Sequence, residues 1–268
     1  MAKSNDSRIL GWERRQEILR FVRAHGSATI SGITQQVGVS PATLHRDLET
    51  LAEQGLIERV YGGAVALEPP DDPPVASERQ QRVAEKQQIA DAAVERIVRG
   101  VNSIFLEAST TIAHMVPALR DLTDKVFVTN SPEIALELAT GEVEVMLIGG
   151  NLRHRTLSTI GPLAIQAVEA VHIDLAYIGV SALNVGGLTT MNSIEAQTKA
   201  ALIKAADTAI ALSDGTKLGK QALVHVAPLS ALSELITDAG APADEVNRLR
   251  AAGLTVTVAE PSSARGAA

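Results

Sequence analysis

The fold of the first quarter of the chain is decided by the stretch VSPATLHRDL, residues 39–48. Ser40 and Pro41 predict the start of a helix, because serine caps the first helical turn and proline suits the first helical position. Leu44, Leu48 and Leu51 then recur at the spacing of one helix face, so we expect them to be buried. Small, polar or cationic side chains lie on the opposite face and its edges: Ala42, Thr43, His45 and Arg46.

The preceding segments complete a compact motif. Residues 12–24 have the apolar spacing of a helix that ends at Gly26, and a short helix is predicted after Ser31, with Gly38 at the turn that precedes Ser40. A short helix, a glycine turn and a helix with a cationic outer face form a helix-turn-helix, which enters the major groove of DNA.

The segment that follows the helix predicts a wing. After Gly55, the runs LIERV (56–60) and YGGAV (61–65) have the pattern of a tight β-hairpin, from which Arg59 can reach a DNA phosphate. The alternative for this whole module is a small three-helix bundle that makes protein contacts, with its charges solvated.

The sequence EPPDDPP, residues 68–74, predicts a boundary between two domains, because four prolines in six residues cannot continue a helix or a central strand. We therefore predict a winged helix-turn-helix over residues 1–66 and a proline-rich linker over 67–76. A larger domain follows over 77–260, and the small polar residues 261–268 predict a disordered tail.

The larger domain has the pattern of an α/β fold. Residues 77–98 have helical composition, and from about residue 100 short apolar runs alternate with amphipathic segments such as 132–139 and 194–206. Such alternation predicts parallel strands joined by crossover helices. Seven strands are expected, at residues 103–106, 125–129, 144–148, 175–179, 208–212, 234–237 and 255–258.

Composition excludes several classes of site. The chain has no cysteine, and its six histidines show no metal-ligand spacing, so we expect neither a disulfide, a metal site nor a cofactor. No signal segment opens the sequence and no apolar run reaches about 18 residues, so we expect a cytoplasmic protein with no membrane partner.

The charge is distributed unevenly. The net charge of −7 disfavours nucleic acid as a partner of the chain as a whole. However, residues 1–64 contain 8 Lys or Arg against 7 Asp or Glu, which leaves 16 against 24 for the rest. A nearly neutral module can bind DNA if its cations share one face, since the local field decides at contact distance.

Polar residues follow several of the predicted strands. Ser109, Thr110 and Thr111 come after one strand and open a helix, where free N–H groups and hydroxyls favour a phosphate. The loops at the carboxyl ends of parallel strands are where open α/β sheets bind ligands. The candidate ligand residues of these loops are Glu107, Ser109, Thr110, Thr111, Asn130, Ser131, Gly149, Gly150, Asp214 and Lys217.

Each of these loops also has a purely structural interpretation. The Ser-Thr-Thr run and Asn130-Ser131 can be helix caps, and Gly149-Gly150 can be a plain turn. Asp214 and Lys217 can form a surface ion pair that contributes under about 1 kcal/mol. The simpler interpretation of Arg153 and Arg155 is that they are exposed loop residues. For Asp174 and Lys199, we favour structural or inter-subunit roles.

Motifs from both modules carry a family resemblance. The N-terminal ones are ERRQEIL (13–19), VSPATLHRDL (39–48), Leu51 with GLI (55–57), and GGA (62–64). The C-terminal ones, in order, are FLEASTT (105–111), TNS (129–131), GG (149–150), GLTT (187–190) and SDGTKLG (213–219). Through about residue 238 the chain resembles the DeoR family of bacterial repressors, whose sensor domain is similar to the ribose-phosphate-isomerase and CoA-transferase fold.

The chain departs from the family pattern at three places. Leu44-His45 stands where Ile-Arg is usual, and Tyr61 stands where His is usual before the two glycines. In the first loop, Glu107-Ala108-Ser109 replaces the usual Asp-x-Gly. These differences imply an altered operator sequence and a shifted ligand.

The resemblance implies a ligand-gated repressor of a carbohydrate or polyol operon, with a phosphorylated sugar or polyol as effector. Operator double-stranded DNA is its expected partner, and a homo-oligomer, dimer or tetramer, is expected because one winged module makes few contacts. No catalytic residue is expected. Two alternatives are a sugar-phosphate isomerase-like enzyme and a DNA-binding protein with a purely structural C-terminal domain. The residues expected to contact DNA are Ser40, Ala42, Thr43, His45, Arg46 and Arg59.

Overall fold

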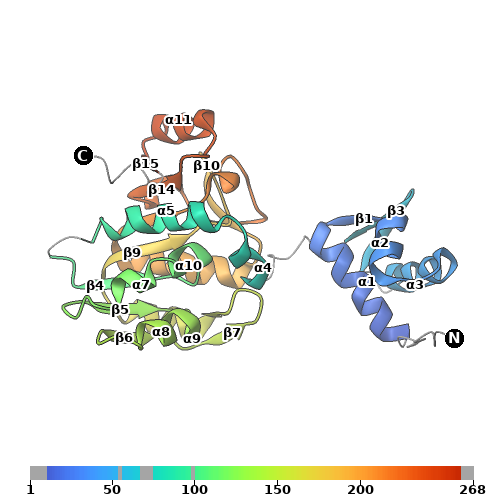
Figure 1. Ribbon diagram of the computed structural model, residues 1–268, viewed down its shortest axis with the longest axis horizontal. Helices are drawn as coiled ribbons and strands as arrows, with labels where there is room; N and C mark the ends of the chain where they lie inside the picture. Colours follow the sequence, from blue (N-terminus) through green and yellow to red (C-terminus); the bar gives the residue numbers. More distant parts are fainter. Residues whose placement is uncertain (1–10, 54–55, 67–74, 98–99, 261–268) are drawn as a thin grey trace, which may run out of the picture. The chain divides into compact units, whose positions relative to one another are not determined.

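The computed structural model describes residues 11–53, 56–66, 75–97 and 100–260 (Figure 1). The chain forms two compact units, Met1–Asp71 and Asp72–Ala268. Of the predicted linker, only Val75 and Ala76 are described, and they begin helix α4, Val75–Gln80. The predicted tail, residues 261–268, lies outside the described residues.

The N-terminal unit is a winged helix-turn-helix. Its helices are α1 (Gly11–His25), α2 (Ile30–Val37) and α3 (Pro41–Glu53). Its strands β1 (Ser27–Thr29), β2 (Ile57–Val60) and β3 (Gly63–Ala66) form an antiparallel sheet in the order β1-β3-β2. The predicted hairpin is therefore present, and it is extended by β1, which the sequence analysis did not predict.

The turn between α2 and α3 follows from local chemistry. Thr29 caps α2 by accepting the Gly32 N–H, so this helix begins two residues earlier than predicted. Gly38 ends it with φ at 69°, a left-handed conformation that glycine adopts without strain. Ser40 then accepts the Thr43 N–H at 3.2 Å and starts α3 as predicted. Leu44, Leu48 and Leu51 are buried in the core of the unit, which confirms the predicted inner face.

The second unit is built on a seven-stranded parallel sheet in the order β15-β14-β12-β9-β4-β5-β6. All seven predicted strands belong to it. Their bounds are β4 Ser103–Leu106, β5 Val126–Thr129, β6 Glu144–Leu147, β9 Ile173–Gly179, β12 Ala206–Leu212, β14 Glu234–Asp238 and β15 Thr255–Ala259.

Helices cover both faces of this sheet, and each face has its own apolar core (Figure 1). On β4, Phe105 belongs to one core while Ile104 and Leu106 belong to the other, because successive strand residues point to opposite faces. One core includes residues of α5 (Val83–Val94), α6 (Thr110–Ala113), α7 (Val116–Leu119) and α8 (Pro132–Leu138). The other includes residues of α9 (Pro162–Glu169), α10 (Ser193–Ala205) and α11 (Ala243–Ala251).

Two features differ from the sequence-based expectation. The helical segment predicted from residue 77 is two helices, α4 and α5, because Arg82 takes a left-handed conformation with φ at 53°. Five short antiparallel strands were also not predicted: β7 (Asn151–Arg153), β8 (Ser158–Ile160), β10 (Ala182–Asn184), β11 (Gly187–Thr190) and β13 (Val224–Ala227). Two short 3₁₀ helices, Gly215–Lys217 and Leu229–Ala231, complete the described elements.

Candidate DNA interface and sensor cavity

The outer face of α3 is open to solvent. Ser40, Ala42, His45 and Arg46 are exposed and Thr43 is half-buried, while the leucines of the same helix are buried. The predicted groove-reading face is therefore available to a partner over one continuous helix surface.

Asp47, next to Arg46 in the sequence, points inward. It is buried, and it accepts hydrogen bonds from Arg14 Nε at 2.6 Å and Arg14 Nη2 at 3.1 Å. The hydrogen bond to this carboxylate raises the pKa of Arg14, and Arg15 Nη1 lies 3.5 Å away from Asp47. These adjacent residues therefore have different roles. Asp47 joins α3 to α1 through its hydrogen bonds with Arg14, whereas Arg46 is exposed on the surface.

The wing places one cation and one aromatic ring in solvent. Arg59 on β2 is exposed, with Nη1 3.6 Å from Glu49 on α3. Tyr61 at the hairpin tip is fully exposed and precedes Gly62, whose φ is 83°. Gly63 has no room for a side chain, since a Cβ there would lie 2.2 Å from the Ala28 carbonyl oxygen.

In the second unit, a cavity of about 410 Å³ lies at the carboxyl ends of β4, β9 and β12. Three predicted ligand residues line it: Ser109, Thr110 and Lys217. Four cations reach its wall in total: Arg155, Lys199, Lys217 and Lys220. Glu78 and Glu195 also line it, so the cavity combines hydroxyls, cations and two carboxylates.

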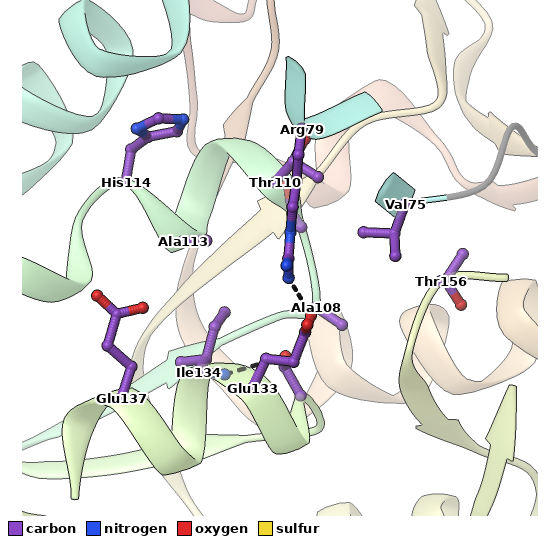
Figure 2. Close-up of a pocket in the computed structure, with 12 residues that line it drawn as sticks. Val75, Arg79, Ala108, Thr110, Ala113, His114, Glu133, Ile134, Glu137 and Thr156 are labelled. Carbon is purple, nitrogen blue, oxygen red and sulfur yellow. Dashed lines mark hydrogen bonds and ion pairs between the residues drawn. The ribbon is translucent and has the colours of Figure 1, made fainter. Parts of the chain in front are cut away.

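A second chamber of about 310 Å³ adjoins the first and shares Ser109 and Thr110 with it. Figure 2 shows Arg79 reaching from α4 toward Glu133 at the start of α8, with which it forms an ion pair. His114, also on the wall, has a pKa lowered by burial and by the nearby Lys86 ammonium. This chamber is the less cationic of the two.

Beneath the first cavity lies a buried ion pair. Glu107 Oε1 is 3.0 Å from Lys199 Nζ, and both side chains are almost fully buried. Glu107 Oε2 accepts the Gly179 N–H at 2.7 Å, and Lys199 Nζ donates to the Gly179 carbonyl at 2.8 Å. Burial raises the pKa of Glu107, although Lys199 and the Gly179 N–H oppose that rise. The pair therefore holds the peptide groups at the end of β9 in place.

Both units match models of known protein families. A family model described as the DeoR-like helix-turn-helix domain matches residues 14–69, and one described as the DeoR C terminal sensor domain matches residues 81–239. The chain belongs to the DeoR family. Together the two models cover most of this DeoR-family protein, which is therefore a DNA-binding transcriptional regulator with a sensor domain.

Individual transcriptional regulators match most of this chain and most of their own length. The HTH-type transcriptional regulator GlpR of Haloferax volcanii is 36% identical, over 92% of this chain and 98% of its own. The glycerol-3-phosphate regulon repressor of Escherichia coli K12 is 29% identical, over 86% of this chain and 92% of its own. The transcriptional repressor AccR of Agrobacterium fabrum is also 29% identical, over 85% and 90%.

Among solved structures, ribose 5-phosphate isomerase A of Methanocaldococcus jannaschii matches 49% of this chain and 52% of its own, with 15% identity and a TM-score of 0.36. Likeness at this level carries no functional argument. The fold class predicted for this DeoR-family regulator, a winged helix-turn-helix followed by an α/β domain on a parallel sheet, is confirmed by its own topology and by the family models.

The other predicted ligand residues of this regulator do not line the first cavity. Thr111 is buried. Asn130 is buried and holds two loops together, accepting the Ala108 N–H through Oδ1 and donating to the Thr159 carbonyl through Nδ2. Ser131 caps α8 by accepting the Ile134 N–H, and it lines the second chamber.

Gly149, Gly150 and Asp214 line neither chamber. Gly150 is packed so closely that a Cβ there would lie 2.9 Å from the Ile160 carbonyl oxygen. Asp214 is buried and caps a 3₁₀ turn by accepting the Thr216 N–H at 3.0 Å. Direct ligand contact by these residues remains a prediction, and the visible role of Gly150 and Asp214 is to shape the loops that contain them.

The positive charge of the cavity comes from side chains more than from a helix N-terminus. Helix α6 has only four residues, and Ser109 Oγ already accepts the Thr111 N–H as its cap. Its N-terminus therefore adds little to an anion site, and the positive charge comes from the side chains of Arg155, Lys199, Lys217 and Lys220. Arg155 had been interpreted as an exposed loop residue, as had Arg153, whose side chain is 9% exposed and lies 3.4 Å from Glu195.

One further polar group forms at the opposite end of the sheet. His172 Nε2 lies 3.1 Å from Asp207 and 4.0 Å from Asp174, although histidine spacing in the sequence predicts no metal site. Asp174 already accepts the N–H groups of Asn102 and Ser103, which lowers its pKa. Hydrogen bonding thus accounts for Asp174 without a ligand.

None of the described helices is both long enough and apolar enough to span a bilayer.

Proposed function

We propose that this regulator represses a carbohydrate or polyol catabolic operon and leaves its operator when a phosphorylated sugar or polyol binds. One observation carries the proposal: the cavity at the carboxyl edge of the sheet collects hydroxyls and cations from three separate loops. A relative also supports a phosphorylated effector, since it is named the glycerol-3-phosphate regulon repressor.

The cavity has the chemistry to separate the two ends of such an effector. Lys217, Lys220 and Arg155 offer positive charge to a phosphate, and Ser109 and Thr110 add hydroxyl groups. The adjoining chamber offers Ser131 and the carboxylates of Glu133 and Glu137, which can accept hydrogen bonds from sugar hydroxyls. Glu107 supports this site from behind, because both of its oxygens are already engaged.

The DNA contacts follow from the open face of α3. We propose that Arg46, His45 and Thr43 read base edges in the major groove, while Ser40 and Ala42 allow close approach. Arg59 on the wing would contact a phosphate. An arginine that binds a guanine through two hydrogen bonds contributes about 1–3 kcal/mol of discrimination.

A homo-oligomer is also part of the proposal. Large apolar side chains are exposed on the edge strand β6 and on the elements that flank it. These are Leu136, Met146, Leu147 and Leu152. A second copy of the chain would bury them and place two reading helices on one operator, as a symmetric dimer does.

Binding without turnover is the mode that the geometry favours. An isomerase needs a base beside the carbon from which it removes a proton. Glu107, the carboxylate that the enzyme alternative would use, is held by Lys199 and the Gly179 N–H. We therefore propose no catalytic residue.

The DNA half of the proposal is tested by the affinity of Arg46→Ala for a fragment from upstream of its own gene. Affinity should fall about ten- to a hundredfold, with an unchanged melting temperature. Arg248→Ala is the matched control, because Arg248 is also an exposed arginine and lies on α11, outside the DNA-binding unit. Equal binding by wild type and Arg46→Ala would place the DNA-reading face elsewhere.

The sensor half is tested by a thermal-shift screen of sugar and polyol phosphates. A ligand at about 100 times its dissociation constant adds roughly 2.7 kcal/mol of stability. Stabilisation by a phosphate ester that its dephosphorylated form does not reproduce is the expected result. Absence of any stabilisation across the series would contradict a phosphate-binding sensor.

A further inference from the structure

The cation of the cavity already has an anionic partner within the protein. Glu78 on α4 lines the cavity, and its Oε2 lies 3.3 Å from Lys217 Nζ. The two side chains keep 22% and 26% exposure, so the pair is open to exchange with a solute anion. A phosphate that reaches Lys217 must therefore compete with the Glu78 carboxylate.

Helix α4 is held by polar contacts with the walls of the two chambers. The Val75 N–H donates to the Arg155 carbonyl at 2.8 Å, and Arg79 pairs with Glu133 across the second chamber (Figure 2). None of the six residues of α4 is buried. Since none of its side chains is fully buried, exchange of the charged contacts of this helix can change its position.

The neighbouring lysines favour an anion at this point. Lys86 is buried, its ammonium donates to the Glu78 carbonyl, and it is close enough to Lys217 for their charges to repel. Burial lowers the pKa of Lys86, and that repulsion lowers it further. The Glu78 carboxylate offsets the repulsion between the two lysines, and a phosphate in its place would do the same.

We propose that Glu78 is a built-in competitor for the phosphate of the effector, and that its displacement from Lys217 releases α4. This inference rests on the proposed function. Helix α4 is the first described helix after the DNA-binding unit in the chain, so its release changes the part of the second unit that is nearest to that unit in sequence. The effector then favours the released state because it binds Lys217 only there.

The test is a calorimetric titration of the full-length protein with inorganic phosphate at constant ionic strength. Glu78→Gln removes the competing charge and should bind phosphate about fivefold more tightly than wild type. Lys217→Gln should bind at least about tenfold more weakly. Glu85→Gln is the matched control, because it removes the same charge from a glutamate that pairs with Arg82 and does not line the cavity.

Backbone hydrogen exchange of residues 75–82 tests the release of α4. Phosphate should speed exchange of this segment in wild type, and Glu78→Gln should show faster exchange without phosphate. Slower exchange on adding phosphate would overturn the inference, because it would mean that α4 closes over the anion.

The variants separate this inference from the proposed function. If Lys217→Gln weakens phosphate binding while Glu78→Gln and Glu85→Gln both match wild type, the cavity is the anion site but Glu78 is no competitor. If Lys217→Gln binds phosphate like wild type, the anion site lies elsewhere and both proposals fail.

Discussion

Replacing Lys199 by methionine leaves the buried Glu107 carboxylate without its cationic partner. In the folded protein, the side chains of Glu107 and Lys199 are 4% and 5% exposed, and Glu107 Oε1 lies 3.0 Å from Lys199 Nζ. Removing one partner of such a pair costs about 3–5 kcal/mol, because the remaining charge stays buried without compensation. Domains of this kind are stable by about 5–15 kcal/mol, so the loss is a large part of the total.

The pH dependence of this loss has a definite sign. The pKa of Glu107 is already raised by burial, and Lys199→Met removes the opposing attraction, so it rises further. A carboxyl group whose folded pKa is raised contributes stability below its unfolded pKa of about 4.3, and that contribution is lost as the pH rises through the folded pKa. The deficit of Lys199→Met relative to wild type should therefore grow from mild acid toward neutral pH.

Urea unfolding of wild type and variant across this pH range measures the deficit. The double variant Glu107→Gln/Lys199→Met is the control, since it removes the stranded charge and should recover much of the lost free energy of unfolding. A deficit below about 1 kcal/mol at neutral pH, or one that does not vary with pH, would refute the assignment of a buried ion pair under the cavity.

Three further predictions concern single positions. Asp47→Ala should lower the stability of the N-terminal unit by about 1.5–3 kcal/mol in urea, because it removes the carboxylate that holds Arg14. Gly179→Ala should abolish binding of inorganic phosphate in calorimetry, since its Cβ would lie 2.6 Å from Ser109 Cβ. Asp174→Asn should cost about 1 kcal/mol at neutral pH. Because the pKa of Asp174 is lowered by the N–H groups of Ser103 and Asn102, that cost should vanish as urea unfolding is repeated in acid, below this lowered pKa.

The sequence predicted the parallel sheet well because its inner strands are short apolar runs that are mostly buried. Residues such as Phe105 and Tyr177 leave little alternative to a central strand. The strands β10, β11 and β13 were not predicted, because they are three or four residues long and form only by pairing with other segments of the chain. The break between α4 and α5 at Arg82 was not predicted, because arginine seldom adopts a left-handed conformation.

The candidate site was predictable only in part. Ser109, Thr110 and Lys217 follow strands directly, so the position of ligand loops in parallel sheets was enough to find them. Glu78 and Arg155 reach the cavity through tertiary packing of α4 and of the loop between β7 and β8, which local sequence patterns do not encode.

In the proposed mechanism, the cavity of the sensor unit controls the release of DNA. The most direct measurement is a gel-shift titration of operator-bound protein with the sugar phosphate that stabilises it best, for wild type, Thr110→Val and Lys220→Ala, both of which change residues that line the cavity. Each lost contact should weaken effector binding by about 1.5–3 kcal/mol, or ten- to more than a hundredfold. Operator affinity without effector should stay within about threefold of wild type, because the effector acts only through its different affinity for the two states.

We therefore predict super-repressors, which bind the operator normally but no longer release it at the effector concentration that frees wild type. Release of both variants at the wild-type effector concentration would contradict the account, because the phosphate would then bind outside this cavity.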